Sequence, residues 1–384
     1  MHFEFATATR IIFGPGTIKE LAPAAKTFGN RALVVTGASS GRVFAAVEQL
    51  RSEGITVSEF HVSGEPTVAL VLSGLEQGRA DGCELVISIG GGSVIDTGKA
   101  IAAMMTNAGE ITDYLEVVGK GQSLTKPSAP YIAIPTTAGT GSEVTRNAVL
   151  GVTERRVKVS LRSPLMLARL AIIDPELTYS SPPEITATSG LDALTQLIEP
   201  FLSNASNPMT DSICREGMRR VARSLHCAYE DGTDAAARED MALAALFGGM
   251  ALANAKLGAV HGFAGPIGGM FPAPHGAVCA RLLPLVMETN LNAIRARAAQ
   301  SPVLGRFAEV AQILTGNQHA RAEDGIQWLR ELCAALKIPS LAIYGVEESD
   351  FPAILAQSRK ASSMKGNPIE LTDAELTRIM ERAL

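Results

Sequence analysis

Four polar side chains in two motifs have the chemistry and spacing of ligands for a metal ion. In GLDALTQLIE, Asp192 and Gln196 stand four residues apart, so on a helix they point the same way. In GAVHGFAGPIGGMFPAPHG, His261 and His275 bracket a predicted helix and turn and can converge on one point. Asp, His and His with an open position is the pattern of a catalytic metal site. The spacing alone also fits an ordinary helix that carries two polar groups, together with two histidines that serve packing.

A glycine-rich loop follows a predicted buried strand in ELVISIGGGSVIDTGKAIA. The strand runs into Gly90, Gly91 and Gly92, and a helix is expected to start at Ser93. Glycines let a phosphate approach the backbone, and the N-terminus of the helix offers free N–H groups. No GK[ST] sequence follows, which argues against nucleotide hydrolysis. A tight turn with no ligand is the alternative.

Two further loops also follow predicted strands. IPTTAGTGSEVT is rich in hydroxyl groups that could bind ribose and phosphate, or it is an ordinary polar loop. VVTGASSG looks like the start of a short-chain dehydrogenase, but none of the five tyrosines has the lysine four residues away that such an enzyme needs. This second loop is either a plain turn or a cofactor contact at the carboxyl end of a parallel strand.

The elements that must position these residues differ between the two halves of the chain. Apolar runs such as RALVVT, ELVISIG, YIAIPT and LAIID alternate with helical stretches, which predicts a Rossmann-like α/β domain with a parallel sheet over residues 1–180. After SSPPEIT the pattern is helical, which predicts an all-α domain over residues 181–384. We expect ligands to bind in a cleft between the two domains.

The composition excludes several classes of protein. The 384 residues are 46% hydrophobic and 19% charged, with a net charge of −5, so neither nucleic acid nor an anionic membrane is an expected partner. Five scattered cysteines without a CxxC pair fit a reducing compartment. No signal-peptide pattern opens the sequence, and no uncharged apolar run reaches about 18 residues. We therefore expect a cytoplasmic protein.

Several motifs together resemble the iron-containing alcohol dehydrogenase family. GGGSVIDTGKAIA, IPTTAGTGSEVT, AIIDPELT, GLDALTQLIE and VHGFAGPIGGMFPAPHG occur in the family's order, and RIIFGPGTIKEL and NPIELTDAEL extend the resemblance to nearly the whole chain. The resemblance implies a dehydroquinate synthase-like architecture and NAD(P)-dependent alcohol–carbonyl chemistry on a small molecule. It also implies a homodimer or a larger homo-oligomer.

Carried over residue by residue, the family's metal ligands are one Asp and three His. Asp192, His261 and His275 match three of them, and Gln196 stands where the iron-type members have the third His. Glycerol dehydrogenases, which resemble this family, bind zinc through one Asp and two His only. The resemblance therefore implies iron or zinc, or a site that has lost its metal. Gly265 is a second departure, because many members carry a further His there, so the pocket is expected to be wider or its proton handling rerouted.

The resemblance also implies a set of cofactor contacts. The pyrophosphate is expected on the glycine loop and the following helix, with hydroxyl groups along the other half of the cofactor and two residues near the nicotinamide. The residues concerned are Gly90, Gly91, Gly92, Ser93, Asp96, Thr136, Thr137, Thr140, Ser142, Lys158 and Leu177.

The adenosine end is assigned to the loop after ALVVT. Many NAD-selective members carry an Asp where this chain has Gly37, followed by Ser39, Ser40 and Arg42. Without the repelling carboxylate, NADP is expected to be accepted, alongside NAD.

In the mechanism that the resemblance implies, a bound metal acts as a Lewis acid on the alcohol or carbonyl oxygen while hydride moves to or from the nicotinamide. Three alternatives remain open. One is a metal-free reductase like maleylacetate reductase, and another is a non-catalytic nucleotide-binding protein. The third is a lyase like dehydroquinate synthase, which is disfavoured because no Lys or Arg lies between Leu257 and Ala280.

Overall fold

The computed structural model describes residues 2–37 and 41–384. The predicted cofactor contacts of Ser39 and Ser40 lie outside the described residues.

The chain forms two compact units. The sheet unit contains Ala6–Thr137 and Gly141–Ser181. The helical unit contains Pro182–Leu384, the short segment Ala138–Thr140 and the N-terminal residues as far as Phe5. A short part of the hydroxyl-rich loop, including Thr140, therefore belongs to the helical unit, although it is flanked in sequence by the sheet unit.

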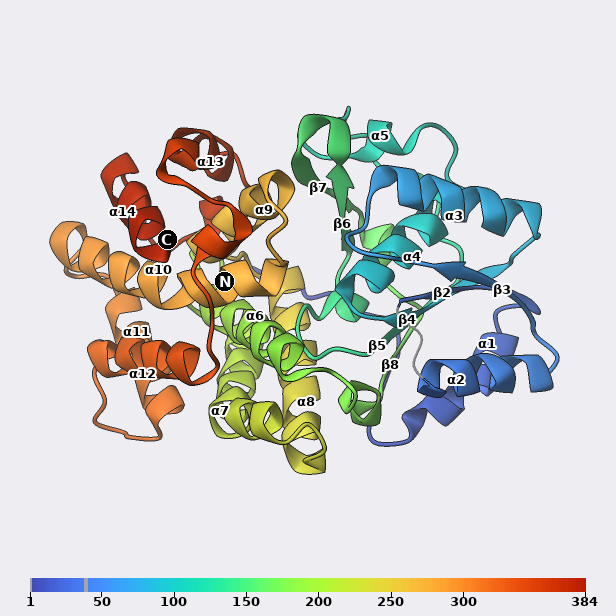
Figure 1. The fold of residues 1–384 in the computed structure, drawn as a ribbon, viewed down its shortest axis with the longest axis horizontal. Coiled ribbons are helices and arrows are strands. Elements are labelled where there is room, and N and C mark those ends of the chain that lie inside the picture. Colours follow the sequence, from blue (N-terminus) through green and yellow to red (C-terminus); the bar gives the residue numbers. More distant parts are fainter. Residues whose placement is uncertain (1, 38–40) are drawn as a thin grey trace. The chain divides into compact units, whose positions relative to one another are not determined.

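Within the described residues, six strands form one parallel sheet in the sheet unit (Figure 1). In spatial order they are β1 (Ile11–Phe13), β8 (Leu170–Ile173), β5 (Tyr131–Pro135), β4 (Leu85–Gly90), β2 (Arg31–Thr36) and β3 (Thr56–His61). The four inner strands are almost entirely buried, which is why their sequences read as continuous apolar runs. The predicted α/β fold with a parallel sheet is confirmed.

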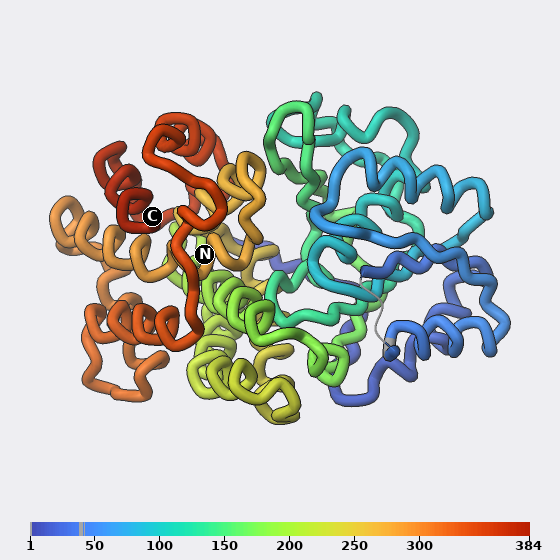
Figure 2. Tube along the Cα trace, in the orientation of Figure 1, coloured from blue at the N-terminus to red at the C-terminus, as the bar shows by residue number. Residues whose placement is uncertain are grey.

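Helices cover both faces of this sheet. They are α1 (Leu21–Lys26), α2 (Gly41–Ser52), α3 (Val68–Ala80) and α4 (Gly92–Thr106), and the short α5 (Ile111–Tyr114) contacts α3. Figures 1 and 2 show α1 and α2 on one face and α3 and α4 on the other. The predicted helix after the glycine loop begins at Gly92, one residue before the expected Ser93.

Four strands were not predicted from the sequence. Two are β1 and β3, which form the edges of the sheet. The other two, β6 (Asn147–Val152) and β7 (Val157–Arg162), pair as an antiparallel hairpin outside the main sheet. The hairpin packs against α4, the helix that follows the glycine loop, and forms a sheet separate from the parallel strands.

The helical unit confirms the predicted all-α second half. Its helices are α6 (Pro183–Leu202), α7 (Pro208–Glu230), α8 (Ala235–Asn254), α9 (Ala259–Met270), α10 (His275–Arg297), α11 (Val303–Thr315), α12 (Ala322–Ala335), α13 (Phe351–Ser358) and α14 (Asp373–Ala383). Helix α6 packs against α7, α8 and α10 and is buried on nearly every side from its second turn onward. A polar residue on α6 therefore lies inside the unit and needs a partner there.

Among the described residues, no single helix has the length and apolar character needed to cross a membrane. Helices α8 and α9 meet that criterion only as a pair, and they are bent by 96° relative to each other. Their apolar side chains belong to the buried core of the helical unit, which accounts for their composition.

Candidate active site

Three helices of the helical unit bring four candidate metal ligands together. Asp192 comes from α6, His261 from α9, and His275 and Cys279 from the first two turns of α10, and one ligand atom of each lies within 4.8 Å of the others. Asp192 Oδ1 is 3.3 Å from His261 Nε2 and 3.7 Å from His275 Nε2. Asp192 and His261 are buried, whereas the side chain of His275 is 35% exposed. The cluster is therefore open on the side of His275.

The start of α9 fixes where His261 lies. Two buried side chains accept the first N–H groups of this helix, which have no acceptor within the helix itself. Asn367 Oδ1 accepts from Ala259 N at 3.1 Å, and Glu199 Oε1 accepts from Val260 N at 2.7 Å. Asn290 on α10 pairs with Asn367 through both amide groups. These contacts tie α6, α9, α10 and the NPIEL segment into one support for the cluster.

Glu199 also determines which nitrogen of His261 faces the cluster. Its Oε2 lies 2.7 Å from His261 Nδ1, and both side chains are buried. A carboxylate can only accept a hydrogen bond, so Nδ1 carries a proton, and whenever the ring is neutral its Nε2 lone pair faces Asp192. This is the carboxylate–histidine arrangement that orients histidine ligands in metal sites.

The charges of the cluster favour a cation. Burial would lower the pKa of His261, but Cys279, Asp192 and Glu199 raise it well above its usual value. Burial would likewise lower the pKa of His275, which Cys279 and Asp192 raise. Burial would raise the pKa of Asp192, but the two histidines and Gln196 keep it below its usual value. Positive charge in this cluster is therefore stabilised, whether a proton or a metal ion supplies it.

Two buried oxygen atoms, one in the cluster and one beside it on α6, lack a hydrogen-bond partner. They are Asp192 Oδ1, which faces both histidines, and Gln196 Oε1. A buried carboxylate oxygen without a donor is costly unless a cation satisfies it. The donor set of Asp192, His261 and His275 thus fits a divalent metal ion. Gln196 is buried beside Asp192 on α6, and its amide oxygen lies near Gly248 of α8.

The predicted phosphate loop belongs to the sheet unit and lies at the carboxyl edge of its sheet. Strand β2 leads through α2 to β3 on one side, and the chain then returns through α3 to β4 on the other side of β2. The strand order therefore reverses between β2 and β4, which is where open α/β sheets bind dinucleotides. The register pairs Thr36 with Ile89 and Gly90 with Pro135, so the loops after β2, β4 and β5 begin at the same level.

The glycines of this edge differ in what surrounds them. A Cβ added at Gly98 of α4 would lie 2.0 Å from Ser88 Oγ on β4, so Gly98 allows the helix to pack on the strand. A Cβ at Gly91 would meet only the Thr137 side chain, at an ordinary 3.5 Å. Gly91, the N-cap residue of α4, therefore leaves space above the helix N-terminus, as a bound phosphate requires.

A buried lysine links several of the predicted cofactor residues. Lys99 Nζ on α4 donates to Ser142 Oγ at 2.9 Å, Thr145 Oγ1 at 2.9 Å and the carbonyl of Asn147 at 2.7 Å. Asp96 accepts from the Ser142 hydroxyl and, at 2.9 Å, from the N–H of Val149. The polar groups of Asp96 and Ser142 thus hold the hydroxyl-rich loop and the hairpin onto α4, and their contact with a cofactor stays a prediction.

Two of the predicted cofactor residues, Lys158 and Leu177, have partners away from this edge, whereas Gly37 lies at it. Lys158 on β7 forms a 3.1 Å ion pair with Glu65. Leu177 is a core residue packed among the strands and the helices on the α1–α2 face. Gly37 follows β2, and a Cβ there would lie 3.1 Å from Val94 Cγ2 on α4. The structure therefore brings Gly37, Gly91 and Thr137 to one edge of the sheet, while Lys158 and Leu177 have other partners.

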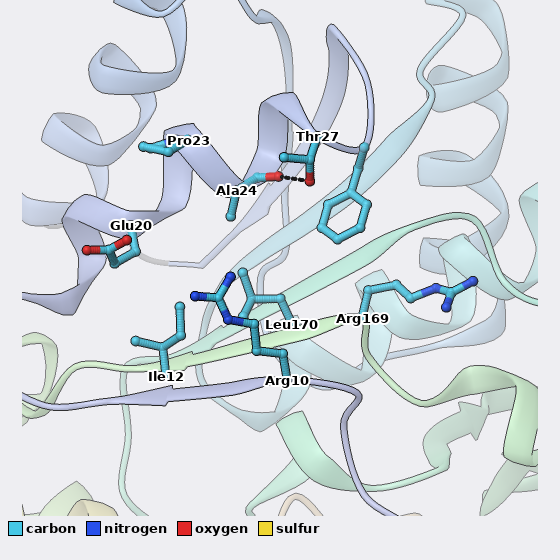
Figure 3. A pocket seen from close by; sticks show the side chains of 9 residues that line it. Arg10, Ile12, Glu20, Pro23, Ala24, Thr27, Arg169 and Leu170 are labelled. Atoms are coloured by element: carbon cyan, nitrogen blue, oxygen red, sulfur yellow. Dashed lines mark hydrogen bonds between the residues drawn. The ribbon is translucent and has the colours of Figure 1, made fainter.

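A hollow elsewhere on the sheet unit does not belong to this edge. It lies beside Arg10 and Arg169, the residues just before β1 and β8, and is covered by α1 (Figure 3). It is thus at the amino ends of the strands, whereas phosphate groups bind at the carboxyl ends. In Figure 3 the Arg169 side chain points away from Arg10, so the two guanidinium groups do not converge on an anion.

Comparison with known proteins identifies the family. The model of the iron-containing alcohol dehydrogenase family matches residues 8–175, and the model of the family's C-terminal region matches residues 186–384. The chain belongs to the iron-containing alcohol dehydrogenase family, whose members use NAD(P) and a divalent metal.

Three relatives illustrate the match. Alcohol dehydrogenase 4 of Saccharomyces cerevisiae is 36% identical over 97% of this chain and 96% of its own length. The 1,3-propanediol dehydrogenase of Citrobacter freundii is 35% identical over 99% and 98%. A crystal structure of a 1,3-propanediol oxidoreductase superposes with a TM-score of 0.93 at 34% identity, covering 100% of both chains.

Sequence reasoning missed three residues that the structure brings into these sites. Glu199 lies seven residues after Asp192, two helical turns along the same face, and that spacing could have identified it. Cys279 lies four residues after His275, which is also a helical spacing. Lys99 is a fully buried lysine, and nothing in its local sequence distinguishes it from a surface residue of α4.

Proposed function

We propose that this chain is an NAD(P)-dependent alcohol dehydrogenase that can also work in reverse as an aldehyde or ketone reductase, with a divalent metal on the Asp192 cluster. That it is an oxidoreductase acting on CH–OH groups follows from its family and its relatives. The observation that carries the metal is the convergence of Asp192 Oδ1 and two imidazole Nε2 atoms, with no donor for the oxygen. The substrate is a small-molecule alcohol or carbonyl compound.

The chain's own residues have distinct tasks in this proposal. Asp192, His261 and His275 bind the metal, which when present supplies a Lewis acid that polarises the C–O bond of the substrate. Glu199 holds the proton of His261 on Nδ1 and keeps Nε2 free as a ligand atom. The apolar core around α6 excludes water from behind the cluster, which strengthens every charge interaction within it. The partly exposed His275 side is the way in for substrate.

The metal-binding part is tested by removing single ligands. Asp192→Ala and His261→Ala should each abolish bound metal, measured by elemental analysis, together with alcohol-dependent reduction of NAD(P). The matched control is Asp211→Ala, since Asp211 is a buried carboxylate of the same unit that pairs with Arg306 instead. If the chelator-stripped wild type keeps full turnover, the chain is a metal-free reductase and this part of the proposal is wrong.

The cofactor-binding part is tested at the glycine loop. Gly91→Ala should fold normally, because its Cβ would make only an ordinary contact with Thr137, yet it should raise the Kd of the cofactor strongly by occupying the phosphate position. Gly98→Ala provides the contrast, since its Cβ would collide with Ser88 and lower stability. Unchanged cofactor affinity in a folded Gly91→Ala protein would show that the pyrophosphate binds elsewhere.

We propose that NADP(H) is accepted alongside NAD(H), because no carboxylate follows β2 to repel a 2′-phosphate. Gly37→Asp should then lower kcat/KM for NADP relative to NAD by a factor that corresponds to about 1–3 kcal/mol of discrimination, the usual scale for such a contact. A Cβ at Gly37 is already tight against Val94, so Gly37→Ala is the steric control. A wild type that uses NAD alone would contradict the proposal.

We further propose a cytoplasmic homodimer or larger homo-oligomer. The reducing compartment is supported by five cysteines that are all free thiols. Light scattering on the purified protein tests the assembly, and a monomer at micromolar concentration would contradict it.

A further inference from the structure

Asp192, His261 and His275 provide three ligands, and a tetrahedral metal ion has room for a fourth. Gln196 stands where the iron-type members of the family have their third histidine, and an amide oxygen is a weak ligand. Cys279 lies within the same cluster as Asp192, His261 and His275. Its Sγ atom is 3.6 Å from His275 Nε2 and 3.9 Å from His261 Nε2. Cys279 is thus not at any of the ligand positions that the family resemblance implies.

Four of the six distances between the four ligand atoms are close to those around a tetrahedral ion. Bonds of about 2.0–2.1 Å to nitrogen or oxygen and about 2.3 Å to sulfur place neighbouring ligand atoms about 3.3–3.6 Å apart. The Asp192 Oδ1 to Nε2 distances are 3.3 and 3.7 Å, and the Sγ to Nε2 distances are 3.6 and 3.9 Å. The four side chains therefore need only small shifts to surround one ion.

The lone pairs that meet at Cys279 also fit a cation. A thiol has one hydrogen to donate, but Sγ of Cys279 faces the Nε2 atoms of both histidines. With the His261 proton held on Nδ1 by Glu199, the contact of Sγ with His261 Nε2 joins two lone pairs unless the thiol hydrogen or a cation lies between them. Asp192 Oδ1, which also lacks a donor, adds a further acceptor at the same point.

We propose that the Cys279 thiolate is the fourth protein ligand of the metal and replaces the histidine that the chain lacks at Gln196. The inference rests on the proposed function, which supplies the metal. It restores four protein ligands with a donor set of one oxygen, two nitrogens and one sulfur. Because thiolate sulfur favours zinc over harder ions, the site is a zinc site rather than an iron site. Gln196 then supports Asp192 from the same helix and does not bind the ion.

Cobalt(II) substitution tests the ligand directly, with no need for activity. The full-length protein is stripped with a chelator, loaded with one cobalt per chain, and examined by absorption spectroscopy. A cobalt–thiolate bond gives a charge-transfer band in the near ultraviolet, and visible bands report the bound ion whatever its ligands. We expect both in the wild type and in Cys227→Ser, which removes an exposed cysteine of the same unit. In Cys279→Ser we expect only the visible bands.

Three results separate this inference from the proposed function. Bound cobalt with visible bands and no charge-transfer band in the wild type overturns the role of Cys279 and leaves the metal enzyme standing. No cobalt or zinc binding by the wild type overturns both. A charge-transfer band that persists in Cys279→Ser and disappears in Cys227→Ser also overturns the inference. The wild-type spectrum decides the question even if Cys279→Ser fails to fold.

Metal choice gives a second readout. The affinity for zinc should fall about 100-fold or more in Cys279→Ser, beyond the loss that removal of an outer hydrogen-bond partner brings. The affinity for iron(II) should fall less, so the zinc-to-iron ratio decreases. An unchanged ratio would refute the role of the sulfur in metal choice.

Discussion

Glu199 offers a sharp test of the proposed metal site because it acts through His261 and is not itself one of the proposed ligands. Its two oxygens accept from Val260 N and from His261 Nδ1, each at 2.7 Å, inside the core of the helical unit. Glu199→Gln preserves the shape of the side chain but provides only one acceptor oxygen. Whichever way the amide turns, it keeps one of these two hydrogen bonds and loses the other.

The cost can be worked out from these contacts. A buried hydrogen bond to a charged group contributes about 1.5–3 kcal/mol, and each 1.4 kcal/mol is a factor of ten in an equilibrium constant. If the amide N–H₂ faces His261 Nδ1, the ring proton moves to Nε2 and the ligand lone pair is lost. If the amide oxygen faces His261, the Val260 N–H is unpaired and the start of α9 loosens. We therefore expect zinc affinity to fall about 10- to 100-fold.

The assay is competition for zinc against a chelating dye at neutral pH, together with NMR of the histidine ring nitrogens in the zinc-free protein. Glu309→Gln is the matched control, since Glu309 pairs with Arg215 on the same unit. Wild-type zinc affinity in Glu199→Gln, with Nδ1 of His261 still protonated, would refute the role assigned to Glu199. A loss of zinc affinity together with a changed tautomer would support it.

Three further outcomes are expected. Gln196→His should tighten zinc binding and should recover most of the affinity lost in Cys279→Ala; unchanged affinity in that background would mean that residue 196 cannot reach the ion. Burial raises the pKa of Glu143 to about 7, above its usual 4.5, so its contribution to stability is complete below about pH 4.5 and is lost as the pH rises through 7. We measure the free energy of unfolding in urea for Glu143→Gln and for the wild type. The difference, variant minus wild type, should increase by up to about 3 kcal/mol between about pH 5 and about pH 8. Parallel pH curves for the two proteins would contradict this. A Cβ at Gly265 would meet nothing within 4 Å, so Gly265→Ala should stabilise α9 by about 0.5–1 kcal/mol. The larger side chain of Gly265→Phe should fill this space and lower kcat/KM for branched alcohols about tenfold relative to ethanol. Equal losses for all alcohols would show that this space is not part of the substrate pocket.

Much of the fold could be predicted because the pattern of each element is local. The run RALVVT is a strand because it is apolar throughout, as a strand covered on both faces must be. The run PEITATSGLDALTQLIEPFL is a helix because its pattern is helical and Pro183 suits its first turn. The hairpin of β6 and β7 could not be predicted this way. It is held by Lys99 and Asp96, which are more than 40 residues away in sequence.

The sequence by itself determined the types of residue available for chemistry: an Asp, two His, a glycine loop after a strand, and the absence of a third histidine at position 196. It determined these because ligand chemistry and helical spacing are properties of the residues themselves. Only the tertiary structure decided which groups complete the site. Glu199 and Cys279 reach His261 from α6 and α10 across 62 and 18 residues of chain, and such contacts depend on how helices pack rather than on any local pattern. The same packing leaves Asp192 Oδ1 buried without a donor, and this missing partner is what points to a cation.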